Sequence, residues 1–242
     1  MNIEHTTALV TGANRGLGRE LVRQLLAAGA RKVYAGARDP ATLSSLVQAD
    51  PARVVALALD ITRAEQIQAA HDQCPDVTLL INNAGINRAQ GFLSAPSTQD
   101  AVDEVMTNYI GTLSMCRAFA PRLAGGALVN VLSILAKVNL PAMGSLCASK
   151  AAGLRMTEGL RAELAAQRTQ VLAVMTGAVD TDMSRDFQGP KSSTEEVARA
   201  VLGGLKDGAQ EVYVGDMAAW INAASLTDPK ALEHELAKYL PA

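Results

Sequence analysis

The chain contains 242 residues, of which 49% are hydrophobic, so it is long enough and apolar enough for one large domain with a buried core. A net charge of −2 argues against nucleic acid or an anionic membrane as a partner. Aromatic residues account for only 3%, so the core is expected to consist mainly of Ala, Val, Leu and Ile.

The cysteines and the N-terminal sequence indicate the compartment. Cys74, Cys116 and Cys147 are odd in number and widely spaced, which predicts neither a disulfide framework nor a metal site. The first ten residues lack the pattern of a signal peptide, and no apolar run approaches the roughly 18 residues that a membrane-spanning helix needs. We therefore expect a reduced, cytoplasmic protein without a membrane partner.

Short apolar segments alternate with longer helical patterns along the chain. Strands are predicted at Thr7–Thr11, Lys32–Ala37, Val54–Leu59, Thr78–Asn82, Ala127–Leu132, Val171–Met175 and Glu211–Val214. Helices are predicted at Gly16–Ala28, Ala41–Ala49, Ala64–Gln73, Thr98–Leu123, Ser145–Gln167 and Thr194–Lys206, with a short amphipathic helix in DPKALEHELAKYL. The alternation predicts an α/β fold with helices on both faces of a parallel sheet, and residues 1–242 are expected to form one domain.

A glycine-rich stretch, ALVTGANRGLGREL, joins the first predicted strand to the first helix. Gly12, Gly16 and Gly18 allow a tight turn and a close approach of the backbone to a pyrophosphate. The helix that follows begins with unpaired N–H groups, which suit a phosphate. The stretch therefore predicts a dinucleotide site, with a simple connecting turn as the alternative. The same loop contributes three further candidate contacts, Asn14, Arg15 and Leu17.

Two arginines indicate which dinucleotide is bound. An acidic residue at the end of the second strand would hold both ribose hydroxyls of NAD, whereas an arginine there favours the 2′-phosphate of NADP. Arg38 occupies that place, and Arg15 lies in the glycine-rich loop. Asp39 is expected to cap the following helix instead. The prediction is NADP(H), and two solvated surface arginines are the alternative.

The ends of the third and fourth strands supply further candidate contacts. LALDIT places Asp60 and Ile61 toward the adenine, although Asp60 could also be the N-cap of the next helix. LLINNAG places Asn83, Ala84 and Gly85 beside the ribose, although a plain turn would use the same residue types.

The longest segment without clear regular structure spans residues 177–193 and follows the sixth strand. Ligands of open α/β sheets bind beyond the carboxyl ends of the strands. The segment is therefore a candidate substrate loop, and an ordinary mobile surface loop is the alternative.

Taken in order, these motifs resemble those of the short-chain dehydrogenase/reductase family over essentially the whole chain. The resemblance rests on TGANRGLG, on NNAG, on Asn108 in NYIG, on Ser133 in NVLS and on Lys150 in CASK. It implies a single-domain, doubly wound Rossmann fold with about seven strands that binds NAD or NADP. It also implies a homodimer or homotetramer that packs through the helices at Thr98–Leu123 and Ser145–Gln167.

The resemblance implies catalytic roles as well. Asn108 would hold a water in a proton relay, and Ser133 would hydrogen-bond the substrate oxygen. Lys150 would bind the nicotinamide ribose and lower the pKa of a catalytic tyrosine. That tyrosine belongs thirteen positions after Ser133 and four before Lys150, where this chain has Leu146.

A second departure lies after the sixth strand, where Thr176 replaces the usual proline of the family. Gly177, Val179 and Thr181 still match the family pattern. The resemblance places Val179 at the nicotinamide carboxamide and Thr181 at the pyrophosphate.

Leu146 leaves three functions open, because losing a positioned general acid costs on the order of a hundred- to ten-thousand-fold in rate. The first is an NADP-dependent carbonyl reductase impaired by this leucine. The second is an imine or iminium reductase, whose substrate already carries the charge that draws a hydride. The third is a non-catalytic NADP-binding sensor or scaffold. Leu135, Val138, Leu140, Met143 and Leu146 predict an apolar pocket near the nicotinamide, and hence an apolar carbonyl or imine substrate, with ordinary core contacts as the alternative.

Overall fold

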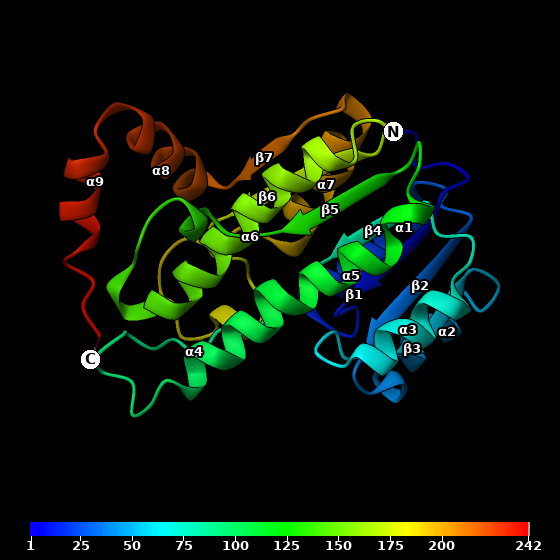
Figure 1. The fold of residues 1–242 in the computed structure, drawn as a ribbon, viewed down its shortest axis with the longest axis horizontal. Helices are drawn as coiled ribbons and strands as arrows, with labels where there is room; N and C mark the ends of the chain where they lie inside the picture. The colour runs from blue at the N-terminus through cyan, green and yellow to red at the C-terminus, as the bar shows by residue number, and fades with distance from the viewer. Residues whose placement is uncertain (242) are drawn as a thin grey trace.

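A parallel sheet forms the centre of the computed structural model, which describes residues 1–241 (Figure 1). Within these residues the sheet has seven strands in the order β3-β2-β1-β4-β5-β6-β7, so the predicted doubly wound α/β fold is confirmed. The strands are β1 (Thr7–Thr11), β2 (Lys32–Ala37), β3 (Val54–Ala58), β4 (Leu79–Asn82), β5 (Ala127–Val131), β6 (Gln170–Thr176) and β7 (Glu211–Val214).

The strands are apolar because the sheet is covered on both faces. Every residue of β1 and β4 is buried, which explains why these strands appear in the sequence as continuous apolar runs. Neighbouring side chains still alternate between the faces. Val10 belongs to one core cluster, whereas Leu9 belongs to the cluster on the opposite face.

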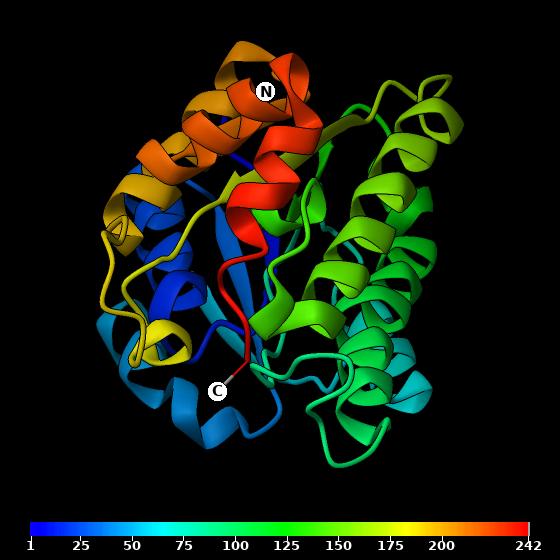
Figure 2. The same ribbon diagram turned by 90° about the vertical axis from the view of Figure 1, so that its left-hand side faces the viewer.

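Two layers of helices cover the sheet. The first layer contains α1 (Gly16–Ala27), α2 (Ser44–Ala49) and α7 (Thr194–Asp207), whose buried side chains meet in one cluster. The second contains α3 (Ala64–Gln73), α4 (Gln99–Glu104), α5 (Thr112–Phe119) and α6 (Gly144–Glu163). Figure 2 shows the sheet between the layers, with blue and orange helices on one side and green helices on the other.

The C-terminal part of the chain packs at the β7 side of the molecule (Figure 1). Helices α8 (Asp216–Thr227) and α9 (Pro229–Leu236) bury Ile221 and Leu232 against Ile134. Helix α9 lies within the predicted amphipathic stretch, whereas α8 was not predicted from its Ala-rich sequence. Across residues 1–241 the structure contains no helix of the length and apolar character needed to cross a bilayer.

The predicted helix at Thr98–Leu123 is interrupted. A π-helical segment, η2 (Val105–Gly111), separates α4 from α5, and the short 3₁₀ segment η3 (Ala120–Arg122) ends the run. The extra residue per turn of a π-helix shifts the side chains that follow it, and such segments occur at functional sites. The other 3₁₀ segments are η1 (Pro40–Leu43), η4 (Ile134–Ala136), η5 (Pro141–Met143) and η6 (Asp182–Ser184).

A buried polar network joins the sheet to α6. The amide of Asn82 on β4 donates to Asn130 Oδ1 on β5 at 2.9 Å, and Asn130 Nδ2 donates to Thr157 Oγ1 on α6 at 2.9 Å. All three side chains are buried, so the bonds fix how α6 lies on the sheet. The same helix carries Leu146 and Lys150.

We expect Asn130→Ala to lower the free energy of unfolding by about 1–3 kcal/mol, because it leaves buried groups on Asn82 and Thr157 without their partner. Urea unfolding followed by circular dichroism measures the change. Gln188→Ala, at an exposed position, is the matched control and should stay within ~0.5 kcal/mol of the parent chain. Equal stabilities for the two variants would refute a structural role for the network.

Candidate active site

The strand order reverses its direction between β1 and β4. Strands β2 and β3 follow outward from β1 toward one edge of the sheet, and β5, β6 and β7 follow outward from β4 toward the other edge. Ligands of such sheets bind where the direction of winding reverses. The loops after β1, β4, β5 and β6 carry most of the residues that the sequence singled out.

The glycine-rich loop packs directly against the end of β4. Gly12 has a φ of +65°, and a Cβ added there would lie 3.0 Å from Ala84 Cα. A Cβ on Gly18 would lie only 2.1 Å from the carbonyl oxygen of Gly12. Both positions therefore require glycine, one for its backbone conformation and the other for the close approach.

Hydrogen bonds from Thr11 and Asn83 hold this contact. Thr11 Oγ1 accepts from the backbone N–H groups of Asn83 and Ala84, each at 3.0 Å. Asn83 Nδ2 donates to the carbonyl oxygens of Thr11 and Gly12 at 3.0 and 3.1 Å. The side chain of Asn83 therefore braces the loop.

The N-terminus of α1 follows the glycine-rich loop. Its N-cap residue, Arg15, makes no side-chain capping hydrogen bond, so the first N–H groups of the helix keep their capacity for an anion. Arg15 Nη1 instead pairs with Asp182 at 2.9 Å. Thr181 lies beside the loop, since a Cβ on Gly16 would be 3.0 Å from its Cγ2. Asn14 is partly exposed in this loop, and Leu17 is buried.

Arg38 is exposed at the end of β2 and acts electrostatically on Asp60 at the end of β3. Burial raises the pKa of the Asp60 carboxyl, but hydrogen bonds from Thr62 and the charges of Arg38 and Arg63 outweigh it and hold that pKa below its ordinary value. Asp39 caps η1 as predicted, accepting from the backbone N–H of Ala41 at 3.0 Å.

Two expectations at the end of β3 need correction. Asp60 is not the N-cap of α3, because it accepts from the N–H and hydroxyl of Thr62 in the turn before the helix, which begins after Arg63. Ile61 is only 5% exposed. Its side chain packs under Gly111 in the core, so it does not project toward a ligand.

The π-helical segment carries Asn108 into the interior. Asn108 Oδ1 accepts from the N–H of Ile86 at 2.8 Å, and its Nδ2 donates to Ile86 O and to Ser149 Oγ, each at 3.0 Å. The amide therefore joins the loop after β4 to α6. The two amide hydrogens are thus occupied, whereas Oδ1 can accept one more hydrogen bond.

Ser133 lies at the end of β5 and caps η4. Its Oγ accepts from the N–H of Leu135 at 3.2 Å and donates to the carbonyl oxygen of Thr176 at 3.3 Å. The hydroxyl is therefore held between the loops that follow β5 and β6. In the loop after β6, Gly177 packs against α8, because a Cβ added to Gly177 would lie 3.3 Å from Met217 Cβ.

Leu146 and Lys150 stand on one face of α6, one turn apart. Lys150 Nζ donates to the carbonyl oxygen of Val131 at 3.1 Å and would lie 3.8 Å from a Cβ on Gly85. Burial lowers the pKa of Lys150 to about 8, although the charge of Glu104 opposes this effect. Leu146 is 7% exposed and has no group that can donate or accept a proton.

The sequence interpretation missed one charged residue of this region. Glu104, at the end of α4, is fully buried and its charge acts on Lys150. Its spacing of four residues from Asn108 suggests one helical face, but only the packing of α4 against α6 shows where the carboxylate lies.

The loop at residues 177–193 has more order than its sequence indicated. It contains η6, and Val179 forms an isolated parallel bridge with Ser192. The bridge closes the loop at its base, so the segment between these residues forms a defined flap beside Arg15 and Gly16.

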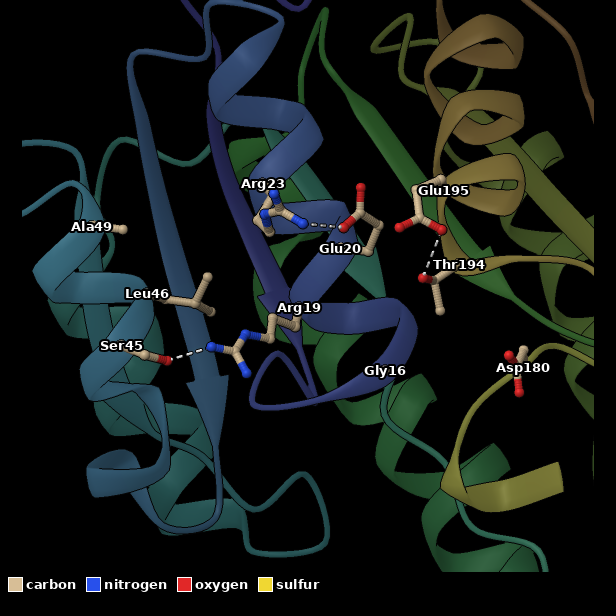
Figure 3. Close-up of a pocket in the computed structure, with 10 residues that line it drawn as sticks. All are labelled: Gly16, Arg19, Glu20, Arg23, Ser45, Leu46, Ala49, Asp180, Thr194 and Glu195. Carbon is tan, nitrogen blue, oxygen red and sulfur yellow. Dashed lines mark hydrogen bonds and ion pairs between the residues drawn. The ribbon is translucent and has the colours of Figure 1, made fainter. Parts of the chain in front are cut away.

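A hollow of about 490 Å³ lies behind the glycine-rich loop, not at the ends of the strands (Figure 3). On one side Arg19 of α1 donates to Ser45 of α2, Arg23 pairs with Glu20 of the same helix at 3.1 Å, and Glu195 of α7 lies on the other side. It shares Gly16 with the glycine-rich loop and Asp180 with the loop at residues 177–193, but its lining includes neither Ser133 nor Lys150. Within residues 1–241, no cluster of His, Cys, Asp or Glu could hold a metal ion.

Comparison with known proteins agrees with this geometry. The family model described as short chain dehydrogenase matches residues 6–191. A short chain dehydrogenase from Burkholderia cenocepacia, crystallised in complex with NADP, is 52% identical with a TM-score of 0.93, and the match covers 98% of this chain and 99% of that one.

Curated relatives are more distant. The 1-deoxy-11-beta-hydroxypentalenate dehydrogenase of Streptomyces avermitilis is 31% identical, over 88% of this chain and 85% of that protein. "Probable oxidoreductase EphD" of Mycobacterium tuberculosis is 34% identical over 79% of this chain, but the match spans only 34% of its length.

We expect Gly18→Ala to destabilise the protein by about 1–3 kcal/mol, because the new methyl group would overlap the Gly12 carbonyl oxygen and displace Asn83. Thermal unfolding measures the effect. Gly159→Ala on α6 is the control, since a Cβ there meets no heavy atom within 4 Å and should be neutral or slightly stabilising. Identical unfolding temperatures would show that the close approach is not required.

Proposed function

Because this chain belongs to the short-chain dehydrogenase family, we propose that it is an NADP-dependent oxidoreductase acting on a small apolar substrate. The observation that carries the proposal is the glycine-rich loop, which packs so closely against the end of β4 that Gly12 and Gly18 have no room for a Cβ, next to the uncapped N-terminus of α1. That cradle fits a pyrophosphate. The relative with 52% identity that binds NADP supports the same conclusion.

Selectivity for NADP is assigned to Arg38. It is exposed beside the ribose edge of the predicted site, and the neighbouring acidic residue, Asp39, accepts the backbone N–H of Ala41 as the cap of η1. A guanidinium binds a phosphate through charge-assisted hydrogen bonds. Arg15 would need to leave Asp182 to join it, so the Arg15–Asp182 pair is expected to respond to the cofactor.

The reaction would occur at the ends of β4, β5 and β6. The bound cofactor supplies or accepts a hydride. Lys150 would hold the nicotinamide ribose, Ser133 would hydrogen-bond the reacting oxygen or nitrogen, and Asn108 would hold a water of the proton relay. Position 146 then faces the reacting group, where the family pattern predicts a tyrosine.

Carbonyl reduction is the first candidate reaction, and Leu146 impairs it. A hydride added to a ketone leaves an alkoxide that needs a proton and a donor aimed at it. Ser133 can donate a hydrogen bond, but an aliphatic hydroxyl has a high pKa and is therefore a poor proton source. The site keeps the groups that orient the substrate and lacks the acid.

Imine reduction is the second candidate, and the burial of Leu146 favours it. This apolar side chain is 7% exposed and forms a wall that neither protonates nor repels an iminium carbon. A protonated imine already carries the positive charge that draws the hydride, so the missing acid costs nothing in that step. Oxidation of NADPH by cyclic imines at several pH values is the assay, and the absence of turnover with every imine would eliminate this candidate.

A homo-oligomer is also proposed. Val102, Val105 and Met106 lie on α4 and η2 and are exposed by 49%, 36% and 41%. Apolar side chains grouped on one helix face are typical of an interface. The contact between copies of the chain would therefore lie on this face of α4 and η2, which belong to one of the two helices through which the family resemblance predicts packing.

Arg38→Ala should weaken NADPH binding by about 10- to 100-fold and leave NADH binding nearly unchanged, because it removes a charge-assisted contact to the 2′-phosphate. Calorimetric titration with both dinucleotides measures this. Arg199→Ala, an exposed arginine on α7, is the control. Equal losses for NADPH and NADH would assign Arg38 a role unrelated to the phosphate.

Leu146→Tyr should raise ketone reduction by about 10²- to 10⁴-fold without changing NADPH affinity, because it supplies a proton donor beside Lys150. The readout is kcat with a panel of apolar ketones. Leu146→Phe fills the same space without a hydroxyl and should show no gain. If the two variants were equally active or equally inactive, position 146 would not be the site of the missing acid.

A further inference from the structure

An ion pair joins the flap between Val179 and Ser192 to the glycine-rich loop. Asp182 begins η6 on the flap, and its Oδ2 accepts from Arg15 Nη1 at 2.9 Å. The same carboxylate also binds the flap itself, since its Oδ1 accepts from Arg185 Nη2 at 2.7 Å. Asp182 is therefore shared between two guanidinium groups, one from each of the two segments that meet here.

The fold of the flap holds this carboxylate in place. At the base of the flap, the N–H of Asp180 donates to the carbonyl oxygen of Ser192 at 2.9 Å. Inside it, Ser184 Oγ donates to the carbonyl oxygen of Thr181 at 3.3 Å, which tightens the turn of η6. Thr181 packs against Gly16, so the next residue, Asp182, is brought to the glycine-rich loop by backbone structure as well as by its charge.

The pair is one that a ligand can displace. The side chains of Arg15 and Asp182 are exposed by 67% and 50%, and exposed ion pairs are weak. Hydrogen bonds from Arg185 and Arg15 hold the pKa of the Asp182 carboxyl below its ordinary value, so it is charged at neutral pH. If Arg15 left, Arg185 would still compensate that charge, because it binds the other oxygen.

A second anion for Arg15 is available where the cofactor is proposed to bind. The glycine-rich loop is hydrogen-bonded to the end of β2, since the N–H of Ala13 donates to the carbonyl oxygen of Gly36 at 2.9 Å. Arg15 follows Ala13 by two residues, and Arg38 follows Gly36 by two residues. The two arginines therefore leave neighbouring stretches of backbone, so a phosphate bound by Arg38 competes with Asp182 for Arg15.

We propose that Asp182 is a specificity-determining residue for the cofactor, because it competes with the 2′-phosphate of NADP(H) for the Arg15 guanidinium. The inference rests on the proposed function, since it concerns a dinucleotide bound at the glycine-rich loop. NADPH draws Arg15 away and frees the flap from that loop. NADH has a hydroxyl in place of the phosphate and leaves the pair intact. Asp182 thus lowers the affinity for NADPH alone and moderates the selectivity that Arg38 supplies.

The test is calorimetric titration of the parent chain and of Asp182→Asn with NADPH and with NADH. The substitution keeps the shape of the side chain and removes its charge. NADPH affinity should rise by about two- to five-fold, the range expected when one competing exposed ion pair is lost, and NADH affinity should not change. Asp186→Asn is the matched control, since it neutralises another exposed carboxylate on the same flap and should leave both affinities nearly unchanged.

A double variant shows whether the gain passes through Arg15. In an Arg15→Ala background the competition is absent, so adding Asp182→Asn should not alter NADPH binding. A gain that persists without Arg15, a gain of equal size for NADPH and NADH, or equal gains in Asp182→Asn and Asp186→Asn would overturn the proposal. A parent chain that binds neither dinucleotide would overturn the proposed function instead.

Hydrogen exchange measures the release of the flap independently of affinity. With each dinucleotide at saturation, the backbone amides of residues 182–185 should exchange about two- to five-fold faster with NADPH than with NADH in the parent chain. In Asp182→Asn the two rates should be equal, because the pair is already absent. Equal rates with both dinucleotides in the parent chain would contradict the release.

Discussion

The close approach of the glycine-rich loop to the end of β4 is the contact on which the rest of the site depends. Thr11 and Asn83 hold the two backbones together, and Gly18 permits a distance that no side chain would allow. Next to this contact, the N-cap residue of α1 makes no side-chain capping hydrogen bond, so the first N–H groups of the helix keep their capacity for an anion. The proposed binding of a dinucleotide follows from this geometry, since a backbone cradle at a helix N-terminus binds phosphate.

The reacting end of the site depends on a second set of contacts, those that fix α6. Asn130 and Thr157 attach this helix to the sheet, Asn108 and Ser149 attach it to η2, and Glu104 attaches its first turn to α4. Lys150 and Leu146 are therefore held in place whether or not catalysis occurs. The proposed choice between a carbonyl and an imine substrate therefore depends on one apolar side chain, Leu146, in an otherwise fixed framework.

The sequence predicted the strands closely because buried parallel strands are continuous apolar runs bounded by turns. It did not predict α8, since its Ala-rich pattern has little amphipathic contrast, nor η2, since a π-helical segment depends on tertiary contacts such as those of Asn108. Ile61 was assigned to the ligand although it packs in the core, because the end of a strand does not reveal which way a side chain turns. Glu104 and the Arg15–Asp182 pair join segments distant in sequence, so no local pattern could indicate them.

A crystal structure of the chain with NADPH tests the central claim most directly, because it shows which atoms the nicotinamide ribose contacts. The account predicts that the ribose hydroxyls lie within hydrogen-bond distance of Lys150 Nζ, that the pyrophosphate lies at the N-terminus of α1, and that Leu146 faces the ring. A dinucleotide bound elsewhere, or no bound dinucleotide at saturating concentration, would contradict it.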